Sequence, residues 1–213
     1  MPIISLLGNK GGAGKTTLAV NLASALNAIG STLLLDADPQ QSSSQWRVLS
    51  SRPNSVSVFN SSNSVEMSVR AQAKSYKYLL IDCPPSIHSN QTKEALRLSD
   101  WAIIPVLPSP LDLWASVKIE DEIKKAKETN PGLKSLLVIN QLEPRTKLSQ
   151  AIRNATVELN TPTAKTAIRR RVVYRSTILE GRSVFDAGSK AYPAVEELSH
   201  LLKEIGISRE QQK

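Results

Sequence analysis

Near its start the chain reads Asn9-Lys10-Gly11-Gly12-Ala13-Gly14-Lys15-Thr16-Thr17, between an apolar run at residues 3–7 and a stretch with helical spacing at residues 15–29. Glycines allow backbone N–H groups to turn toward phosphate oxygens, and the N-terminus of a helix adds partial positive charge. Lys15 would reach the β- and γ-phosphates, and the hydroxyl of Thr16 would bind Mg²⁺. The segment therefore predicts a phosphate-binding loop for ATP and Mg²⁺.

The strict pattern G-x-x-x-x-G-K-[ST] is not met, because its first glycine falls on Asn9. The alternative is a glycine-rich turn that binds nothing. That alternative does not explain why a strand, three glycines, Lys-Thr-Thr and a helix follow one another in this order. We retain the phosphate-loop interpretation and treat the departure at Asn9 as informative.

Outward from the loop, short apolar runs alternate with helical patterns. Strands are expected at residues 3–7, 32–35, 56–59, 78–81, 102–106 and 136–139, and helices at 15–29, 65–73, 112–129 and 194–205. Residues 42–44 and 61–62 are expected to be short polar loops. Apolar strands separated by helices predict an α/β fold, a mainly parallel sheet flanked by helices on both faces. The polar strand ends should then meet at one rim, the usual ligand-binding edge of such folds; these ends are Gly8, Asp36, Asp82, Pro108 and Asn140.

Length and composition agree with one P-loop ATPase domain spanning residues 1–213, with no helix-turn-helix domain before a first strand that starts at residue 3. A single cysteine, Cys83, excludes an internal disulfide and a cysteine-rich metal site. No apolar run approaches the roughly 20 residues of a membrane span. We therefore expect a cytoplasmic protein without membrane contact.

The net charge of +8 is concentrated in one part of the chain. Between residues 145 and 182 nine basic residues face two acidic ones, Glu158 and Glu180, which gives +7. The basic residues are Arg145, Lys147, Arg153, Lys165, Arg169, Arg170, Arg171, Arg175 and Arg182. A basic excess in one stretch indicates a surface for a polyanion, with a solvated basic face as the alternative.

The segment from Lys10 to Thr17 resembles the deviant Walker A motif of the ParA/MinD family. Residues 105–112 and 174–185 resemble the small plasmid-partition ATPases similar to ParF. In that family an early lysine reaches the nucleotide held by a partner subunit. The resemblance implies that Lys10 acts in this way, in a homodimer with two ATP molecules sandwiched between the subunits.

Carboxylates follow two expected strands beside the loop, which suggests a metal–phosphate site. Asp36-Ala37-Asp38-Pro39 resembles the switch I segment, which implies that Asp38 orients or activates the attacking water and that Asp36 supports the Mg²⁺ shell. Residues 80–85 resemble Walker B and switch II, which implies that Asp82 holds Mg²⁺ through water. Ordinary turn chemistry is the alternative for these acids. Asn140 matches an adenine-contacting asparagine of many relatives, although a plain loop amide fits equally well.

Within the basic window, Arg169, Arg170, Arg171 and Arg175 lie near the start of an expected helix ending at Gly181, and Arg171 and Arg175 are spaced to share a face. We expect these four arginines to bind DNA backbone without sequence preference, most strongly in the dimer.

The resemblance implies a partition ATPase. ATP would drive dimerisation and nucleoid binding, and a centromere-binding, ParB-like adaptor would accelerate slow hydrolysis, so that plasmid or chromosome cargo is segregated. One alternative is a similar ATPase that positions a protein cargo such as a microcompartment. Others are a MinD-like membrane switch, which the mixed charge of residues 198–213 disfavours, and a metabolic P-loop enzyme. An electron-transfer ATPase is excluded, because it would need two cluster cysteines per subunit and this chain has only Cys83.

Overall fold

The computed structural model describes residues 1–53, 55–143 and 159–207, and its strands form one six-stranded sheet in the order β3-β2-β4-β1-β5-β6. Every pairing in the sheet is parallel. The strands are β1 (Ile3–Leu6), β2 (Thr32–Asp36), β3 (Ser57–Asn60), β4 (Tyr78–Asp82), β5 (Trp101–Val106) and β6 (Lys134–Ile139). The predicted parallel α/β sheet is confirmed.

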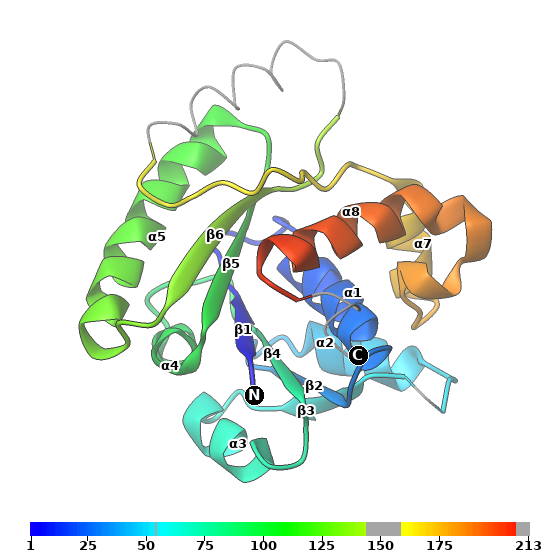
Figure 1. The fold of residues 1–213 in the computed structure, drawn as a ribbon, viewed down its shortest axis with the longest axis horizontal. Coiled ribbons are helices and arrows are strands. Elements are labelled where there is room, and N and C mark those ends of the chain that lie inside the picture. The colour runs from blue at the N-terminus through cyan, green and yellow to red at the C-terminus, as the bar shows by residue number, and fades with distance from the viewer. Residues whose placement is uncertain (54, 144–158, 208–213) are drawn as a thin grey trace.

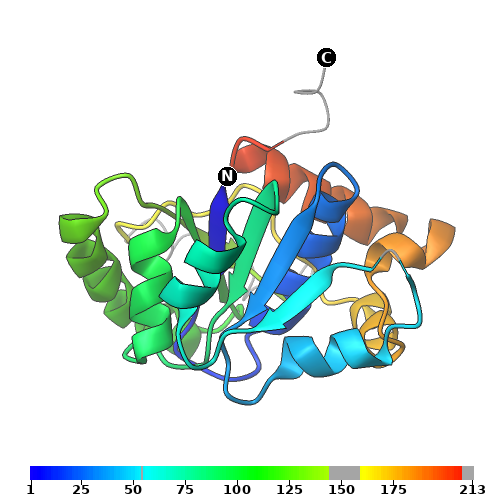
Figure 2. The ribbon, with the colours of Figure 1, turned by 90° about the horizontal axis from the view of Figure 1, so that it is seen from below.

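Helices cover both faces of the sheet (Figure 1, Figure 2). They are α1 (Lys15–Asn27), α2 (Ser42–Leu49), α3 (Val65–Gln72), α4 (Asn90–Leu98), α5 (Pro110–Thr129), α7 (Val172–Leu179) and α8 (Tyr192–Glu204). Successive strand residues supply opposite faces, as the two-residue period of a strand requires. On β2, Leu34 packs with α1 and α8, while Leu33 and Leu35 pack with the layer of α3, α4 and α5.

The carboxyl ends of the strands meet at one rim, as expected. Asp36 at the end of β2 lies directly opposite Asp82 at the end of β4 in the strand register. The backbone N–H of Asn140, just after β6, donates to the carbonyl of Val106 at the end of β5 (2.8 Å). This rim brings together chain segments that are more than 100 residues apart in sequence, such as Ala13 and Asn140.

The structure corrects some of the expected elements. Residues 42–44 are not a polar loop but the first residues of α2, and α4 was not expected at all. The other helices and strands differ from their predicted bounds by a few residues. Among the helices of residues 1–53, 55–143 and 159–207, none combines the length and apolar character needed to span a membrane.

Candidate functional site

The glycine-rich loop joins β1 to α1 and has the backbone shape that its glycines permit. Gly12 and Gly14 have φ values of 80° and 86°, in the left-handed region that side chains disfavour. A Cβ atom on Gly14 would lie 2.3 Å from Nδ2 of Asn140, so this position also needs glycine for space. Gly14 is the N-cap of α1 and has no side chain to bond the first N–H groups of the helix. These donors are therefore left to an anion.

Lys15 is buried against this loop, with 6% of its surface exposed. Its Nζ donates to the carbonyl oxygen of Lys10 (3.0 Å). Burial lowers the pKa of Lys15, while the nearby charges of Asp82 and Asp38 act in the opposite direction. A desolvated ammonium at the foot of α1 is well placed to attract phosphate.

Lys10 forms an ion pair with the first turn of α5. Its Nζ lies 3.3 Å from Oδ1 of Asp112, in the first turn of α5, and about half of its side chain is exposed. In this arrangement the ammonium of Lys10 sits over α5 and is accessible from outside the subunit. The trans-acting role implied by the family resemblance stays a prediction.

Asp82 and Thr16 lie together beneath the loop. Asp82 is 1% exposed; its Oδ2 accepts a hydrogen bond from Oγ of Ser43 (2.7 Å), and the Thr16 hydroxyl also bonds its carboxylate. Burial raises the pKa of Asp82 to about 7, with the hydrogen bonds from Ser43 and Thr16 opposing that rise. Oδ1 is buried without a partner among the described residues. A buried carboxylate oxygen with no donor is what a bound cation or its water would satisfy.

The described residues contain no cluster of three or more His, Cys, Asp or Glu side chains that could hold a metal alone. Mg²⁺ commonly takes only one or two protein ligands and completes its shell with water and phosphate oxygens. Thr16 and Asp82 therefore fit a magnesium–phosphate site better than an all-protein metal site.

Asp36 holds the start of α2. Its Oδ2 accepts from both the backbone N–H and the hydroxyl of Ser44 (2.7 Å each), and its Oδ1 accepts from the backbone N–H of Asp38 (3.3 Å). Burial raises the pKa of Asp36, while the Ser44 hydrogen bonds act against that rise. The structure thus shows Asp36 as an anchor of the switch I segment, and its support of Mg²⁺ remains a prediction.

Asp38 lies in the turn between β2 and α2 and is mostly buried. Its Oδ1 accepts from the backbone N–H of Gln40 (2.9 Å), and its carbonyl accepts from the N–H of Gln41 (2.9 Å). The charge of Asp38 is close enough to Lys15 to influence its pKa. The structure therefore places the predicted water-orienting carboxylate beside the phosphate loop.

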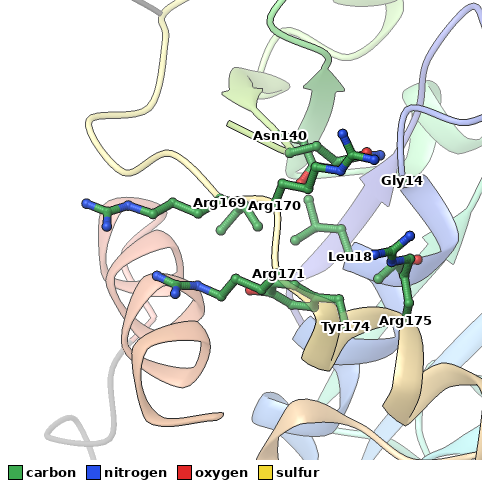
Figure 3. A pocket seen from close by; sticks show the side chains of 11 residues that line it. Gly14, Leu18, Asn140, Arg169, Arg170, Arg171, Tyr174 and Arg175 are labelled. Atoms are coloured by element: carbon green, nitrogen blue, oxygen red, sulfur yellow. The ribbon is translucent and has the colours of Figure 1, made fainter. Parts of the chain in front are cut away.

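A pocket of about 140 Å³ opens beside the loop, between Gly14 and the start of α7 (Figure 3). Asn140, the predicted adenine contact, lines it, but its Nδ2 donates to the carbonyl of Ala13 (2.7 Å). Gln141 follows and donates to the carbonyl of Gly12 (3.1 Å). The remaining lining residues are Gly14, Thr17, Leu18, Ile168, Tyr174 and the four arginines predicted to bind DNA.

Three of those four arginines carry ion pairs that the residue 145–182 window did not include. Arg171 pairs with Glu197 on α8 (2.5 Å), Arg169 lies 3.8 Å from the same carboxylate, and Arg170 pairs with Glu143 (2.8 Å). Arg171 is the N-cap of α7 in an extended conformation, so the prediction that it shares a helix face with Arg175 is wrong. Arg169 and Arg171 extend toward α8, and Arg175 lies on the other side of the pocket (Figure 3). Arg145, Lys147 and Arg153 lie outside the described residues.

With this geometry established, comparison with known proteins identifies the family. Residues 4–184 match the model of the CobQ/CobB/MinD/ParA nucleotide binding domain. The chain belongs to this family. The predicted ParA/MinD relationship is thereby confirmed, and the assignment of the loop between β1 and α1 as the phosphate loop stays a prediction.

Relatives within the family include a protein of Halothiobacillus neapolitanus named maintenance of carboxysome distribution protein A, 37% identical over 199 residues and covering 92% of each chain. Apo McdA of Cyanothece superimposes with a TM-score of 0.77 at 17% identity, covering 96% of this chain and 98% of that one. MinD of Pyrococcus horikoshii, complexed with Mg-ADP, superimposes with a TM-score of 0.74 at 21% identity, covering 96% of this chain and 97% of that one.

Sequence reasoning missed four residues that shape the site: Ser43, Ser44, Asp112 and Gln141. The serines had a usable signal, since serines just after Asp-Pro favour the first turn of a helix. Asp112 and Gln141 had none, because their partners, Lys10 and Gly12, are more than 100 residues away.

Proposed function

We propose that this chain is a ParA-type ATPase that positions a large protein cargo, such as a bacterial microcompartment, over the nucleoid. The observation that carries the proposal is the 37% identity, over nearly the whole of both chains, to a carboxysome distribution protein. It favours a protein cargo over the plasmid or chromosome cargo that the sequence alone had put first.

The nucleotide in this proposal is ATP with Mg²⁺. The residues that would hold the phosphates and the cation are Lys10, Gly11, Gly12, Ala13, Gly14, Lys15, Thr16, Thr17 and Asp82. When bound, Mg²⁺ neutralises charge on the phosphate oxygens and orients them. The unpartnered Oδ1 of Asp82 and the uncapped start of α1 support this assignment. In this proposal the base and ribose would extend into the pocket beside Gly14.

Two side chains would support slow hydrolysis of ATP. Asp38, beside Lys15, would orient a water molecule for attack, and Lys15 would stabilise negative charge on the transferred phosphoryl group. The switch I turn that carries Asp38 is held through Asp36 and Ser44 at the start of α2. An adaptor that shifts this turn would alter the position of Asp38, which gives partner-stimulated hydrolysis a physical basis.

Dimerisation would place Lys10 on the nucleotide of a second subunit. Among the described residues its half-exposed ammonium forms a partly solvated ion pair with Asp112, a weak interaction that phosphate oxygens can replace. ATP, with one more phosphate than ADP, would favour the paired state, so nucleotide state would control dimerisation.

Association with DNA is the least supported part of the proposal, because three of the four arginines are paired within the subunit. Arg175 is exposed, and no ion pair of the described residues includes it. Arg175 is therefore the better candidate for a phosphate contact. Arg170 is the next, because its ion pair with Glu143 is exposed and a phosphate could replace the carboxylate. Non-specific nucleoid binding by the dimer would then let an adaptor on the cargo move along it.

Plasmid partition is the second candidate function, favoured by the resemblance of residues 105–112 to ParF-like proteins. The two functions share the ATPase cycle and differ in cargo. In the native host, a Lys15→Ala substitution at the native locus should cluster fluorescently tagged compartments and leave plasmid retention unchanged. Plasmid loss with evenly spaced compartments would reject the protein-cargo proposal in favour of partition.

The ATPase cycle itself is tested by measuring molar mass with ADP and with ATP, each with and without DNA. We expect a monomer with ADP, a dimer with ATP, and DNA binding by the dimer alone. A MinD-like switch would instead sediment with liposomes in an ATP-dependent way, so a liposome sample without DNA belongs in the same series.

A further inference from the structure

Three backbone carbonyls of the phosphate loop, those of Lys10, Gly12 and Ala13, accept hydrogen bonds from side chains. Lys15 bonds the carbonyl of Lys10, Gln141 bonds that of Gly12 (3.1 Å), and Asn140 bonds that of Ala13 (2.7 Å). The last two donors come from the end of β6, more than 120 residues further along the chain. The loop's shape is therefore set partly from outside the loop.

A bond to a carbonyl also orients the neighbouring N–H group. The peptide unit is planar and trans, so the C=O of one residue and the N–H of the next point in opposite directions. Fixing the carbonyl of Gly12 toward Gln141 turns the N–H of Ala13 away from Gln141, and fixing the carbonyl of Ala13 does the same for the N–H of Gly14. The N–H groups of Ala13 and Gly14 are among the loop donors that would bind phosphate oxygens.

Gln141 reaches the loop because of an unusual backbone conformation. Neighbouring residues of a strand point to opposite sides, so Asn140 and Gln141 could not both face the loop if β6 continued. Gln141 has a φ of 55°, in the left-handed region that is costly for a residue other than glycine. The residues on either side are fixed by backbone bonds, from Asn140 to Val106 (2.8 Å) and from Leu142 to Ile168 (3.0 Å). The left-handed turn is thus held in place and directs both amides to the same loop.

We propose that Gln141 is a positioning residue that sets the direction of the phosphate-binding N–H groups and links the pocket beside Gly14 to the phosphate loop. The proposal rests on the function proposed above, since it assumes that nucleotide phosphates bind this loop. Asn140 shares the task but also leaves too little room for a Cβ at position 14, so its replacement would change packing as well. Gln141, partly exposed, is the cleaner residue to alter.

The experiment compares Gln141→Leu and Gln141→Gly with the wild type. Leucine keeps the size of the side chain without its donor, and glycine removes the donor and relieves the left-handed backbone. Both should raise the dissociation constant for Mg-ADP by about tenfold, the effect of losing one well-placed hydrogen bond to a binding loop. Both should also raise the dissociation constant for tripolyphosphate, which has phosphates but no base. The KM for ATP should rise while kcat at saturation stays near that of the wild type.

The matched control is Gln91→Leu, because Gln91 also donates its amide to a loop carbonyl, that of Ser62 (2.7 Å), away from the phosphate loop. It should leave nucleotide binding unchanged. Wild-type affinity in both Gln141 variants would overturn the proposal. Weaker ADP binding together with normal tripolyphosphate binding would also overturn it, because Gln141 would then act on the adenine base and not on the phosphates. A fall in the ligand-free melting temperature of Gln141→Gly parallel to the affinity loss would indicate a merely structural role. If the wild type itself binds neither ligand, the proposed function fails first.

Discussion

At the scale of single residues, Lys15 combines burial with a positive charge that no side chain in the described residues neutralises by direct hydrogen bonding. Its ammonium is bonded to the carbonyl of Lys10 in a partly buried position. Such a group gains most when an anion replaces the missing counter-charge. The loop is thus prepared for phosphate at some cost to the ligand-free protein.

Lys15→Ala should therefore weaken ATP binding by about 100-fold or more, since a charged contact to phosphate is lost, without lowering the ligand-free melting temperature. Isothermal titration with Mg-ATP measures the first quantity and thermal unfolding the second. Lys74→Ala, at an exposed position after α3, is the control and should bind as the wild type does. Undiminished nucleotide affinity in Lys15→Ala would remove the basis for the proposed function.

The raised pKa of Asp82 should make the stability of the ligand-free protein depend on pH. Burial raises its pKa in the folded protein to about 7, against 3.8 in the unfolded chain, so the folded state binds a proton that the unfolded state has released between these values. The stability that Asp82 contributes is complete below pH 3.8 and is lost as the pH rises toward 7. Between pH 5 and 7 the ligand-free melting temperature should fall by roughly 2–4 °C per pH unit from this group and then level off. Asp82→Asn should lack this slope, and an equal slope in the variant would contradict the assignment.

At the scale of elements, the sequence predicted the strands and the longer helices well because their apolar spacing is local information. Residues 78–81 and 102–106 are apolar throughout, and both lie in buried central strands. It failed at α2, whose first turn depends on Asp36, a residue of β2 that accepts from Ser44. It also missed the ion pair of Arg171, since Glu197 lies on α8, outside the counted window. A side-chain contact across eight residues decided the first outcome, and a contact across 26 residues decided the second.

The link between β2 and α2 predicts the effect of Ser44→Ala. The substitution removes the hydroxyl donor to the buried carboxylate of Asp36 and should lower the free energy of unfolding by about 1–2 kcal/mol. Urea unfolding measures the change. Ser62→Ala is the matched control, because its hydroxyl also bonds a side-chain oxygen, that of Asn60, but in an exposed loop. Its effect should stay below about 0.5 kcal/mol, and equal effects of the two substitutions would show that Asp36 does not anchor α2.

The start of α7 separates the roles of two arginines. Arg171 is largely buried against Glu197 on α8, so Arg171→Ala should reduce stability by about 1 kcal/mol. Arg175→Ala should leave stability unchanged and weaken ATP-dependent DNA binding, with a smaller salt dependence than the wild type. Gel-shift titrations at two salt concentrations, together with thermal unfolding, measure both. DNA binding that survives Arg175→Ala and Arg170→Ala together would assign the contact surface elsewhere.

At the scale of the whole molecule, apolar side chains are exposed next to Lys10, the lysine that is predicted to reach the nucleotide of a second subunit. Leu111, Trp114 and Val117 are 64%, 69% and 48% exposed on the first turns of α5, the same turns that hold Lys10 through Asp112. Large apolar groups in solvent mark a surface that another molecule covers. In the proposed ATP dimer, Lys10 would leave Asp112 for the partner's nucleotide, and the second subunit would approach this end of α5.

Tryptophan fluorescence can follow that approach. Trp46 is buried, and Trp101 lies in β5 under Lys134, so Trp114 is the tryptophan whose surroundings should change most. ATP, but not ADP, should shift the emission to shorter wavelength as Trp114 leaves water. Trp114→Phe should abolish the shift while light scattering still reports a dimer, and Lys10→Ala should abolish both the shift and the dimer. An ATP dimer that forms with no change at Trp114 would place the contact between subunits away from α5, and one that forms without Lys10 would show that the early lysine does not join the subunits.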